Sequence, residues 1–244
     1  MHSLTFVLLL VITAWSALVA QPTNRPYVYV DIAHGQRFWN DPNDPVKGAG
    51  QDIERLKYMT RELEESASAA NATLRYLKTD ITPNALANNS LLFVHIPSAQ
   101  YSAEEVAAVQ QYIRQGGSLF LVLDSDYWST LEQTNVNDLI KPFGIQMGAN
   151  SQDTRPGGYA VASAVTPQKT NVIYHGARTL AGGTPFCFND QSDECFGVYQ
   201  DVEGGGRIVV MGDGMVSLYM TDWEGVEGYP SQEFMQNVFQ WLLE

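Results

Sequence analysis

Residues 101–128 read YSAEEVAAVQQYIRQGGSLFLVLDSDYW, and this stretch decides the fold class. Ser102 and Glu105 occupy capping-box positions, apolar residues recur at helical spacing as far as Ile113, and two glycines follow at 116–117, so a helix is predicted between these signals. The next run, SLFLVLD, is apolar until its last residue, which is typical of a strand covered on both faces. A helix that leads directly into a buried strand indicates a βαβ unit and therefore a parallel sheet.

The same alternation extends along the chain. Further strands are predicted at PYVYVDI (26–32), TLRYLKT (73–79), SLLFVHIPS (90–98) and GGGRIVVMGDG (204–214). Helices are predicted at GQDIERLKYMTRELEES (50–66) and SQEFMQNVFQWLLE (231–244), and a less regular middle from about 146 to 205 holds short strands such as NVIYH and FGVYQD. The expected fold is α/β, a three-layer flavodoxin-like sandwich with a mainly parallel central sheet.

The chain has 244 residues and no Pro/Ser-rich linker, so a single domain over residues 21–244 is expected. The first twenty residues contain no Lys, Arg, Asp or Glu, and the apolar run LTFVLLLVITAWSALVA (4–20) ends in small residues. This pattern predicts a signal peptide at 1–20 with cleavage after Ala20; an uncleaved anchor is the alternative. The expected product is secreted and extracellular, or periplasmic in a bacterium, and has no membrane contact after cleavage.

The net charge is -13, from 14 Lys and Arg against 27 Asp and Glu, and no basic cluster occurs, which argues against nucleic acid as a partner. Cys187 and Cys195 bracket a polar turn in FCFNDQSDECFG, and a disulfide between them is expected in an oxidising compartment. NAT at Asn71 and NNS at Asn88 are glycosylation sequons.

Four segments resemble the class I glutamine amidotransferase-like superfamily: residues 101–128, TNVNDLIKPFGIQM (134–147), GGGRIVVMGDGMVSLYM (204–220) and NVFQWLLE (237–244). More narrowly, they and VDIAHGQ (30–36) are similar to the branch of trehalose-utilisation-type proteins and of the amidotransferase-like domain of intraflagellar-transport subunits. The family's enzymes use a cysteine nucleophile on a strand-to-helix elbow, with a late His and Glu. Here the corresponding strand ends in Asp124, Ser125 and Asp126, and no His follows His175. The resemblance therefore implies a non-catalytic binding scaffold, and a secreted single domain is not expected to be a ciliary transport subunit.

Polar residues follow several of the predicted strands, and the carboxyl ends of parallel strands meet at one edge of a sheet. The expected site is a crevice for a small polar ligand, in particular a carbohydrate or glycan, with aromatic rings available for stacking. Its residues are Asp31, His34, Gln36, Trp39, Asp124, Asp126, Trp128 and Asp213. A divalent cation could lie among the carboxylates of Asp31, Asp124, Asp126 and Asp213, and no other cofactor is expected. The competing interpretation is that each Asp only caps the turn or helix that follows its strand.

Two alternative functions stay open. Asp31 and His34 could serve a hydrolase-type enzyme that acts through water or a divalent metal, because a carboxylate can orient an imidazole general base. The chain could also be an acidic extracellular matrix or structural protein, although long runs of Asp or Glu are missing.

Overall fold

The computed structural model describes residues 25–36, 53–86, 90–214, 219 and 223–244. The strands are β1 (Tyr27–Asp31), β2 (Thr73–Leu77), β3 (Leu91–His95), β4 (Ser118–Val122), β5 (Gln146–Asn150), β6 (Gly158–Ala160), β7 (Thr170–Val172), β8 (Arg178–Ala181), β9 (Thr184–Asn189), β10 (Cys195–Asp201) and β11 (Arg207–Met211). The helices are α1 (Ile53–Ala69), α2 (Ala103–Arg114), α3 (Leu131–Thr134), α4 (Val136–Ile140), the 3₁₀-helix η1 (Lys141–Phe143) and α6 (Ser231–Leu243).

A nine-stranded sheet in the order β2-β1-β3-β4-β11-β10-β9-β6-β7 forms the centre of the molecule. Its first five strands in this order are parallel, and the other four continue the sheet in antiparallel fashion. Strands β5 and β8 form a separate two-stranded sheet. The predicted α/β sandwich with its mainly parallel centre is confirmed, whereas the middle of the chain is more regular than its sequence indicates.

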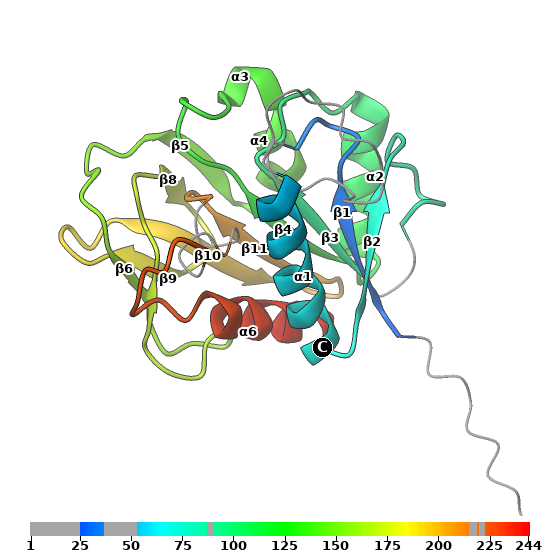
Figure 1. The fold of residues 1–244 in the computed structure, drawn as a ribbon. Helices are drawn as coiled ribbons and strands as arrows, with labels where there is room; N and C mark the ends of the chain where they lie inside the picture. Colours follow the sequence, from blue (N-terminus) through cyan, green and yellow to red (C-terminus); the bar gives the residue numbers. More distant parts are fainter. Residues whose placement is uncertain (1–24, 37–52, 87–89, 215–218, 220–222) are drawn as a thin grey trace, which may run out of the picture.

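Helices cover both faces of the sheet, and Figure 1 shows α1 and α6 lying side by side across one of them. Alternate residues of β4 point to opposite faces: Phe120 belongs to the apolar cluster beneath α1 and α6, and Leu121 to the cluster beneath α2 and α4. Both residues are fully buried. The continuous apolar sequence of β4 is therefore explained by burial on two faces.

The capping box predicted for α2 is present. The Ser102 hydroxyl accepts a hydrogen bond from the Glu105 backbone N–H, and the Glu105 carboxylate accepts one from the Ser102 backbone N–H. This box fixes the position of the first turn of α2 at the carboxyl end of the parallel strands. There Glu105 Oε1 also lies 3.1 Å from His34 Nε2.

The predicted disulfide is wrong, because Cys187 and Cys195 are both free. The polar turn between them does join two paired strands, β9 and β10, but the pairing is irregular between Cys195 and Gly197. As a result Cys187 lies in the cluster beneath α1 and α6, while Cys195 packs against the cluster on the other face. The two thiols are thus held on opposite faces of the sheet and are not oriented to bond.

Candidate functional site

The parallel strands bring three of the predicted site residues to one edge of the sheet. Asp31 is the last residue of β1, and Asp124 and Asp213 each lie two residues after the ends of β4 and β11. All three side chains are buried. Because β3 lies between β1 and β4 in the sheet, the residues separate into two groups with different partners.

The first group is a buried network built around Asp31. Its carboxylate accepts hydrogen bonds from the backbone N–H of Ala33 at 3.1 Å, from His34 Nδ1 at 2.9 Å and from the Tyr101 hydroxyl at 2.7 Å. His34 Nε2 lies 3.1 Å from Oε1 of Glu105. One imidazole therefore connects the end of β1 to the first turn of α2.

The charges in this network support one another. Burial lowers the pKa of His34, but the carboxylates of Asp31 and Glu105 more than offset this, so that its pKa is raised. Burial raises the pKa of Glu105, yet the backbone N–H groups of Ile81 and Ser102, together with His34, bring it below its ordinary value. Burial, with the nearby Asp31, raises the pKa of Tyr101 well above its usual range, so its hydroxyl stays protonated and donates. A protonated His34 can donate to both carboxylates at once.

This geometry limits what Asp31 and His34 can do chemically. A general base needs a ring nitrogen free to take a proton from a substrate. In the part of the chain that the structure describes, each ring nitrogen of His34 faces a carboxylate, and the ring stacks on Tyr101 with 4.0 Å between centroids. The arrangement is that of a structural link, with only 6% of His34 exposed.

The second group contains Asp124 and Asp213. Asp124 accepts from the backbone N–H of Ser125 at 2.6 Å and of Gly214 at 3.0 Å, and Asp213 accepts from the backbone N–H of His175 at 2.7 Å. Burial raises the pKa of Asp124, against the effect of its N–H donors. These carboxylates tie β4, β11 and the segment before β8 together, as the capping interpretation expects.

A fully buried arginine supports the loop that follows β4. Arg178, which is 2% exposed, donates from Nε to the Asp124 carbonyl at 2.7 Å and from Nη2 to the Ser129 carbonyl at 2.9 Å. Its Nη2 also contacts the carboxylate of Asp126. That carboxylate accepts a hydrogen bond from Asn150 Nδ2 at 3.1 Å, and the backbone N–H of Asp126 donates to Asn150 Oδ1 at 3.0 Å. We call residues 124–130 the aromatic loop, because its tip carries Tyr127 and Trp128.

The aromatic loop exposes its two rings to solvent. Tyr127 is 80% exposed and Trp128 is partly exposed, and their rings meet edge to face with centroids 4.9 Å apart. Other large hydrophobic side chains of the described residues are exposed as well, namely Ile53, Trp223 and Val226, and single exposed side chains of this kind are common on protein surfaces.

The remaining predicted residues fall in different places. Gln36 is buried, with Nε2 3.4 Å from the Phe93 carbonyl and its Oε1 without a partner. Trp39 and Asn88 lie outside the described residues, and so does the predicted signal peptide. Asn71 is exposed in the turn after α1, with φ of 57°.

Among the described residues no three His, Cys, Asp or Glu side chains are arranged to hold a metal ion, so the four candidate aspartates do not converge on one metal-binding position.

The sequence-based prediction missed Tyr101, Arg178 and the contact of Glu105 with His34. The sequence pattern around Glu105 predicts only its part in the capping box, which is present. Arg178 follows the run VIYHGA with nothing to mark it as buried, because its carbonyl acceptors are backbone atoms of a distant loop.

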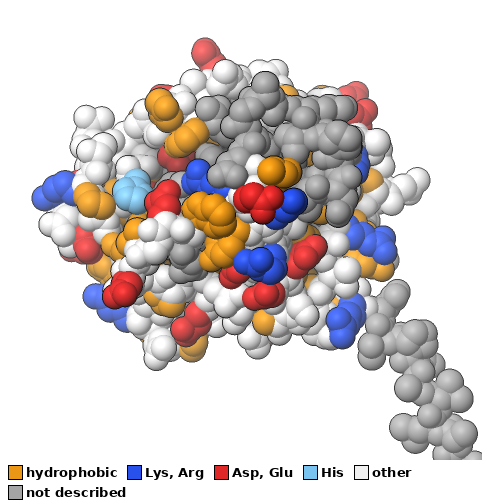
Figure 2. Space-filling view, in the orientation of Figure 1, with side chains coloured by type: hydrophobic (Ala, Val, Ile, Leu, Met, Phe, Trp, Pro, Cys, Tyr) orange, Lys and Arg blue, Asp and Glu red, His pale blue; other side chains and the backbone are white. Residues whose placement is uncertain are grey.

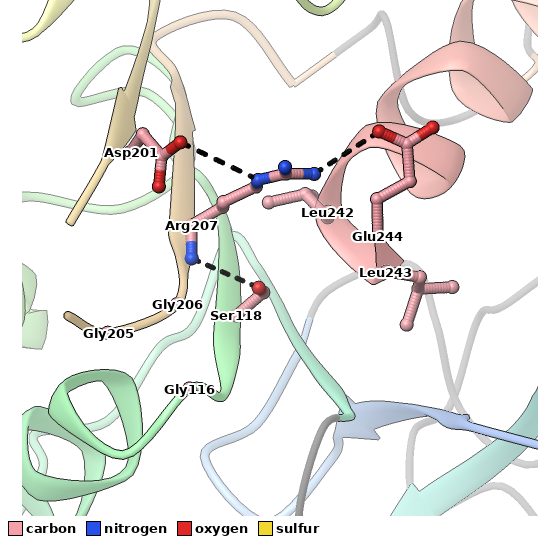
Figure 3. Close-up of a pocket in the computed structure, with 9 residues that line it drawn as sticks. All are labelled: Gly116, Ser118, Asp201, Gly205, Gly206, Arg207, Leu242, Leu243 and Glu244. Atoms are coloured by element: carbon pink, nitrogen blue, oxygen red, sulfur yellow. Dashed lines mark hydrogen bonds and ion pairs between the residues drawn. The ribbon is translucent and has the colours of Figure 1, made fainter. Parts of the chain in front are cut away.

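A pocket of about 350 Å³ lies at the opposite, amino-terminal edge of the sheet. Figure 3 shows the Arg207 guanidinium between the carboxylates of Asp201 and Glu244, with Ser118 bonded to the Arg207 backbone. The cation is thus already neutralised by two acids, and the described lining contains none of the predicted site residues.

Neither the charged side chains on the face shown nor the apolar composition of the described helices indicates a particular kind of partner. Figure 2 shows Lys and Arg side chains interspersed with Asp and Glu on the face that carries α1 and α6, with no continuous basic stripe on that face. None of the described helices combines the length and the apolar composition needed to cross a membrane.

Comparison with known proteins identifies the fold. The model of the IFT52 GIFT domain matches residues 49–155. The structure of the mmIFT52 N-terminal domain is similar at a TM-score of 0.63, with 16% identity over 89% of this chain and 97% of that chain. The chain has an amidotransferase-like fold. No curated protein sequence matches it.

Two further solved structures are similar. Cytoplasmic protein STM3548 from Salmonella typhimurium matches at a TM-score of 0.59, with 10% identity over 89% of this chain and 98% of that chain. Exo-beta-1,4-mannosidase Op5Man5 from Opitutaceae bacterium strain TAV5 matches at 0.52, with 10% identity over 88% of this chain but 35% of that chain. These likenesses confirm the predicted superfamily fold and give no support to the trehalose-utilisation-type branch.

The predicted location is wrong. The matched family model and the matched N-terminal domain are those of an intraflagellar-transport protein, and such proteins are cytoplasmic and ciliary, not secreted or periplasmic. This finding also removes the oxidising compartment that the disulfide prediction assumed and the argument that excluded a ciliary subunit. Glycosylation at the two sequons loses its support as well.

Replacing His34 by Gln is expected to lower the free energy of unfolding by roughly 3 kcal/mol at pH 6, because two buried carboxylates lose their shared cation. The contribution of His34 is fully present below its unfolded pKa of about 6.5 and is lost as the pH rises through its raised folded pKa. The difference between the two proteins should therefore shrink from pH 6 to pH 9 in urea unfolding. His175→Gln, at an exposed histidine, is the control. A difference that is independent of pH would contradict the role of a protonated His34 between the two carboxylates.

Proposed function

We propose that the chain is a non-catalytic amidotransferase-like domain that acts by binding a protein partner, as a docking module in an assembly of the intraflagellar-transport type. The observation that carries this proposal is the closed Asp31–His34–Glu105 network, in which both ring nitrogens face carboxylates. The match to the IFT52 GIFT domain and the similarity to the mmIFT52 N-terminal domain support the type of assembly.

The cysteines also favour binding over acyl transfer. An activated cysteine nucleophile has a lowered pKa and a base beside it. Burial raises the pKa of both Cys187 and Cys195, and they lie on opposite faces of the sheet in β9 and β10. Neither thiol has the surroundings of a nucleophile.

Proximity labelling tests the docking function in a ciliated cell that expresses the chain fused to a biotin ligase. The expected result is biotinylation of intraflagellar-transport proteins above the level seen with the unfused ligase. The purified chain should also release no ammonia from glutamine. Labelling confined to proteins of the secretory pathway, or glutamine hydrolysis that is lost in His34→Gln, would contradict the proposal.

A second candidate is the binding of a small polar ligand, such as a carbohydrate, at the carboxyl edge among Asp31, His34, Gln36, Asp124 and Asp213. It is favoured by Gln36, whose buried Oε1 has no partner and could accept a hydrogen bond from a ligand hydroxyl. The buried carboxylates nearby are fully engaged with protein donors, which is why this candidate ranks second.

Thermal unfolding in the presence of a panel of mono- and oligosaccharides tests this candidate, because any ligand of the native state raises the melting temperature. If Gln36 binds the ligand, one sugar should raise the melting temperature of the wild type and not that of Gln36→Met. Gln110→Met, at a partly exposed glutamine of α2, is the control. No shift with any sugar at millimolar concentration would exclude the candidate.

A further inference from the structure

We infer that the pocket at the amino-terminal edge of the sheet binds a free α-amino acid. Arg207 and Ser118 bind its carboxylate, and Asp201 and Glu244 bind its ammonium group. The inference goes beyond the proposed docking function and does not depend on it. It is carried by donors and acceptors that surround one hollow and have capacity left in the described part of the chain.

The pocket forms where two neighbouring strands begin. Ser118 is the first residue of β4 and Arg207 is the first residue of β11, and the two strands are parallel, so both residues lie at the amino-terminal edge. The last turn of α6 closes the other side with Leu242 and Leu243, as Figure 3 shows. The volume of about 350 Å³ lies within the range of pockets that hold small molecules.

Arg207 is held in place by the end of α6. Its Nη1 donates to the Trp241 carbonyl, and its guanidinium carbon lies 5.1 Å from the centroid of the Trp241 ring. No hydrogen bond or ion pair of the described residues uses Nη2, which keeps its N–H donors for a ligand. A guanidinium whose orientation is already fixed loses little conformational freedom when a carboxylate binds to it.

Ser118 supplies a second donor to the pocket. It is 4% exposed, and its Oγ accepts a hydrogen bond from the Arg207 backbone N–H at 3.1 Å. A serine hydroxyl can donate while it accepts, yet among the described residues the Ser118 hydroxyl has no acceptor for its proton. In Figure 3 the Ser118 side chain points from β4 toward α6, which directs the hydroxyl into the same hollow as the Arg207 side chain.

Asp201 and Glu244 are the acceptors at the rim of the pocket. Their side chains are 72% and 56% exposed, and their carboxylate oxygens lie 4.0 and 3.4 Å from Nε and Nη1 of Arg207. Exposed ion pairs are weak, and a carboxylate has about four acceptor positions, so both groups can also accept from a ligand ammonium group. Two carboxylates beside one guanidinium leave the described lining of the pocket with an excess of one negative charge.

The arrangement of these groups selects the class of ligand. An α-amino acid carries its carboxylate and its ammonium group on one carbon, and the pocket likewise holds its guanidinium next to its carboxylates. A simple carboxylic acid would be repelled by the excess negative charge, and a simple amine would leave the donors of Arg207 and Ser118 unused. The same excess charge favours lysine, whose aliphatic stem can lie along Leu242, over glutamate.

Isothermal titration of the full chain with free L-lysine, L-leucine and L-glutamate tests the class of ligand. Lysine should bind most tightly and leucine less tightly, and glutamate should give no measurable binding. Lysinamide lacks the carboxylate, and Nα-acetyl-lysine lacks the α-ammonium group. Each should bind about tenfold more weakly than lysine, as expected for the loss of a hydrogen bond between charged groups.

Arg207→Gln tests the residues of the site and should weaken lysine binding about tenfold or more, with the melting temperature recorded to show that the variant is folded. The matched control is Arg155→Gln, which replaces an exposed arginine paired with Asp153 outside the pocket and should bind lysine as the wild type does. Should Arg207→Gln fail to fold, Asp201→Asn changes only an exposed side chain of the rim. It should weaken lysine binding about two- to fivefold, the size of an exposed ion pair.

Four outcomes would overturn the inference. No heat of binding with lysine or leucine at millimolar concentration would remove the site. Lysinamide that binds as tightly as lysine would show that the carboxylate is not recognised. Nα-acetyl-lysine that binds as tightly would assign the pocket to the carboxyl end of a peptide and not to a free amino acid. A folded Arg207→Gln variant with the affinity of the wild type would place lysine binding elsewhere on the chain.

Discussion

The ion pairs that a protonated His34 forms with Asp31 through Nδ1 and with Glu105 through Nε2 are the interaction on which the carboxyl edge of this sheet depends. Asp31 ends β1, and Glu105 lies in the first turn of α2 and also accepts from the backbone N–H of Ile81, after β2. Two buried carboxylates would repel each other without a cation between them. The imidazolium offsets that repulsion and ties three segments of the chain together.

Pairing of carboxylates with donors from the protein also stabilises the rest of this edge of the sheet. Each buried carboxylate there has protein donors: backbone N–H groups for Asp124 and Asp213, and Arg178 for the more exposed Asp126. Acidic side chains gather at this edge because the parallel strands end there, and they are satisfied locally.

The fold was largely predictable from the sequence, because burial on two faces and helix caps leave local signals. The run SLFLVLD and the Ser102–Glu105 box both appear as predicted. The partners of Asp31 and the burial of Arg178 were not predictable, since they depend on contacts across 70 and 54 residues of sequence. The disulfide prediction failed for a related reason: an irregularity in the pairing of β9 and β10 reverses the face on which a side chain lies, and spacing alone does not reveal it.

The free energy of unfolding of Asp31→Asn at pH 6 tests most directly whether these buried acids serve structure. From sequence alone, removal of a charge from an acidic crevice would leave stability unchanged or raise it slightly. The structure predicts the opposite, a loss of roughly 2–4 kcal/mol, because Asn replaces one of the two carboxylate oxygens that accept from His34 and Tyr101 by an NH2 donor and removes the negative charge beside the imidazolium. A variant as stable as the wild type, or more stable, would contradict the account.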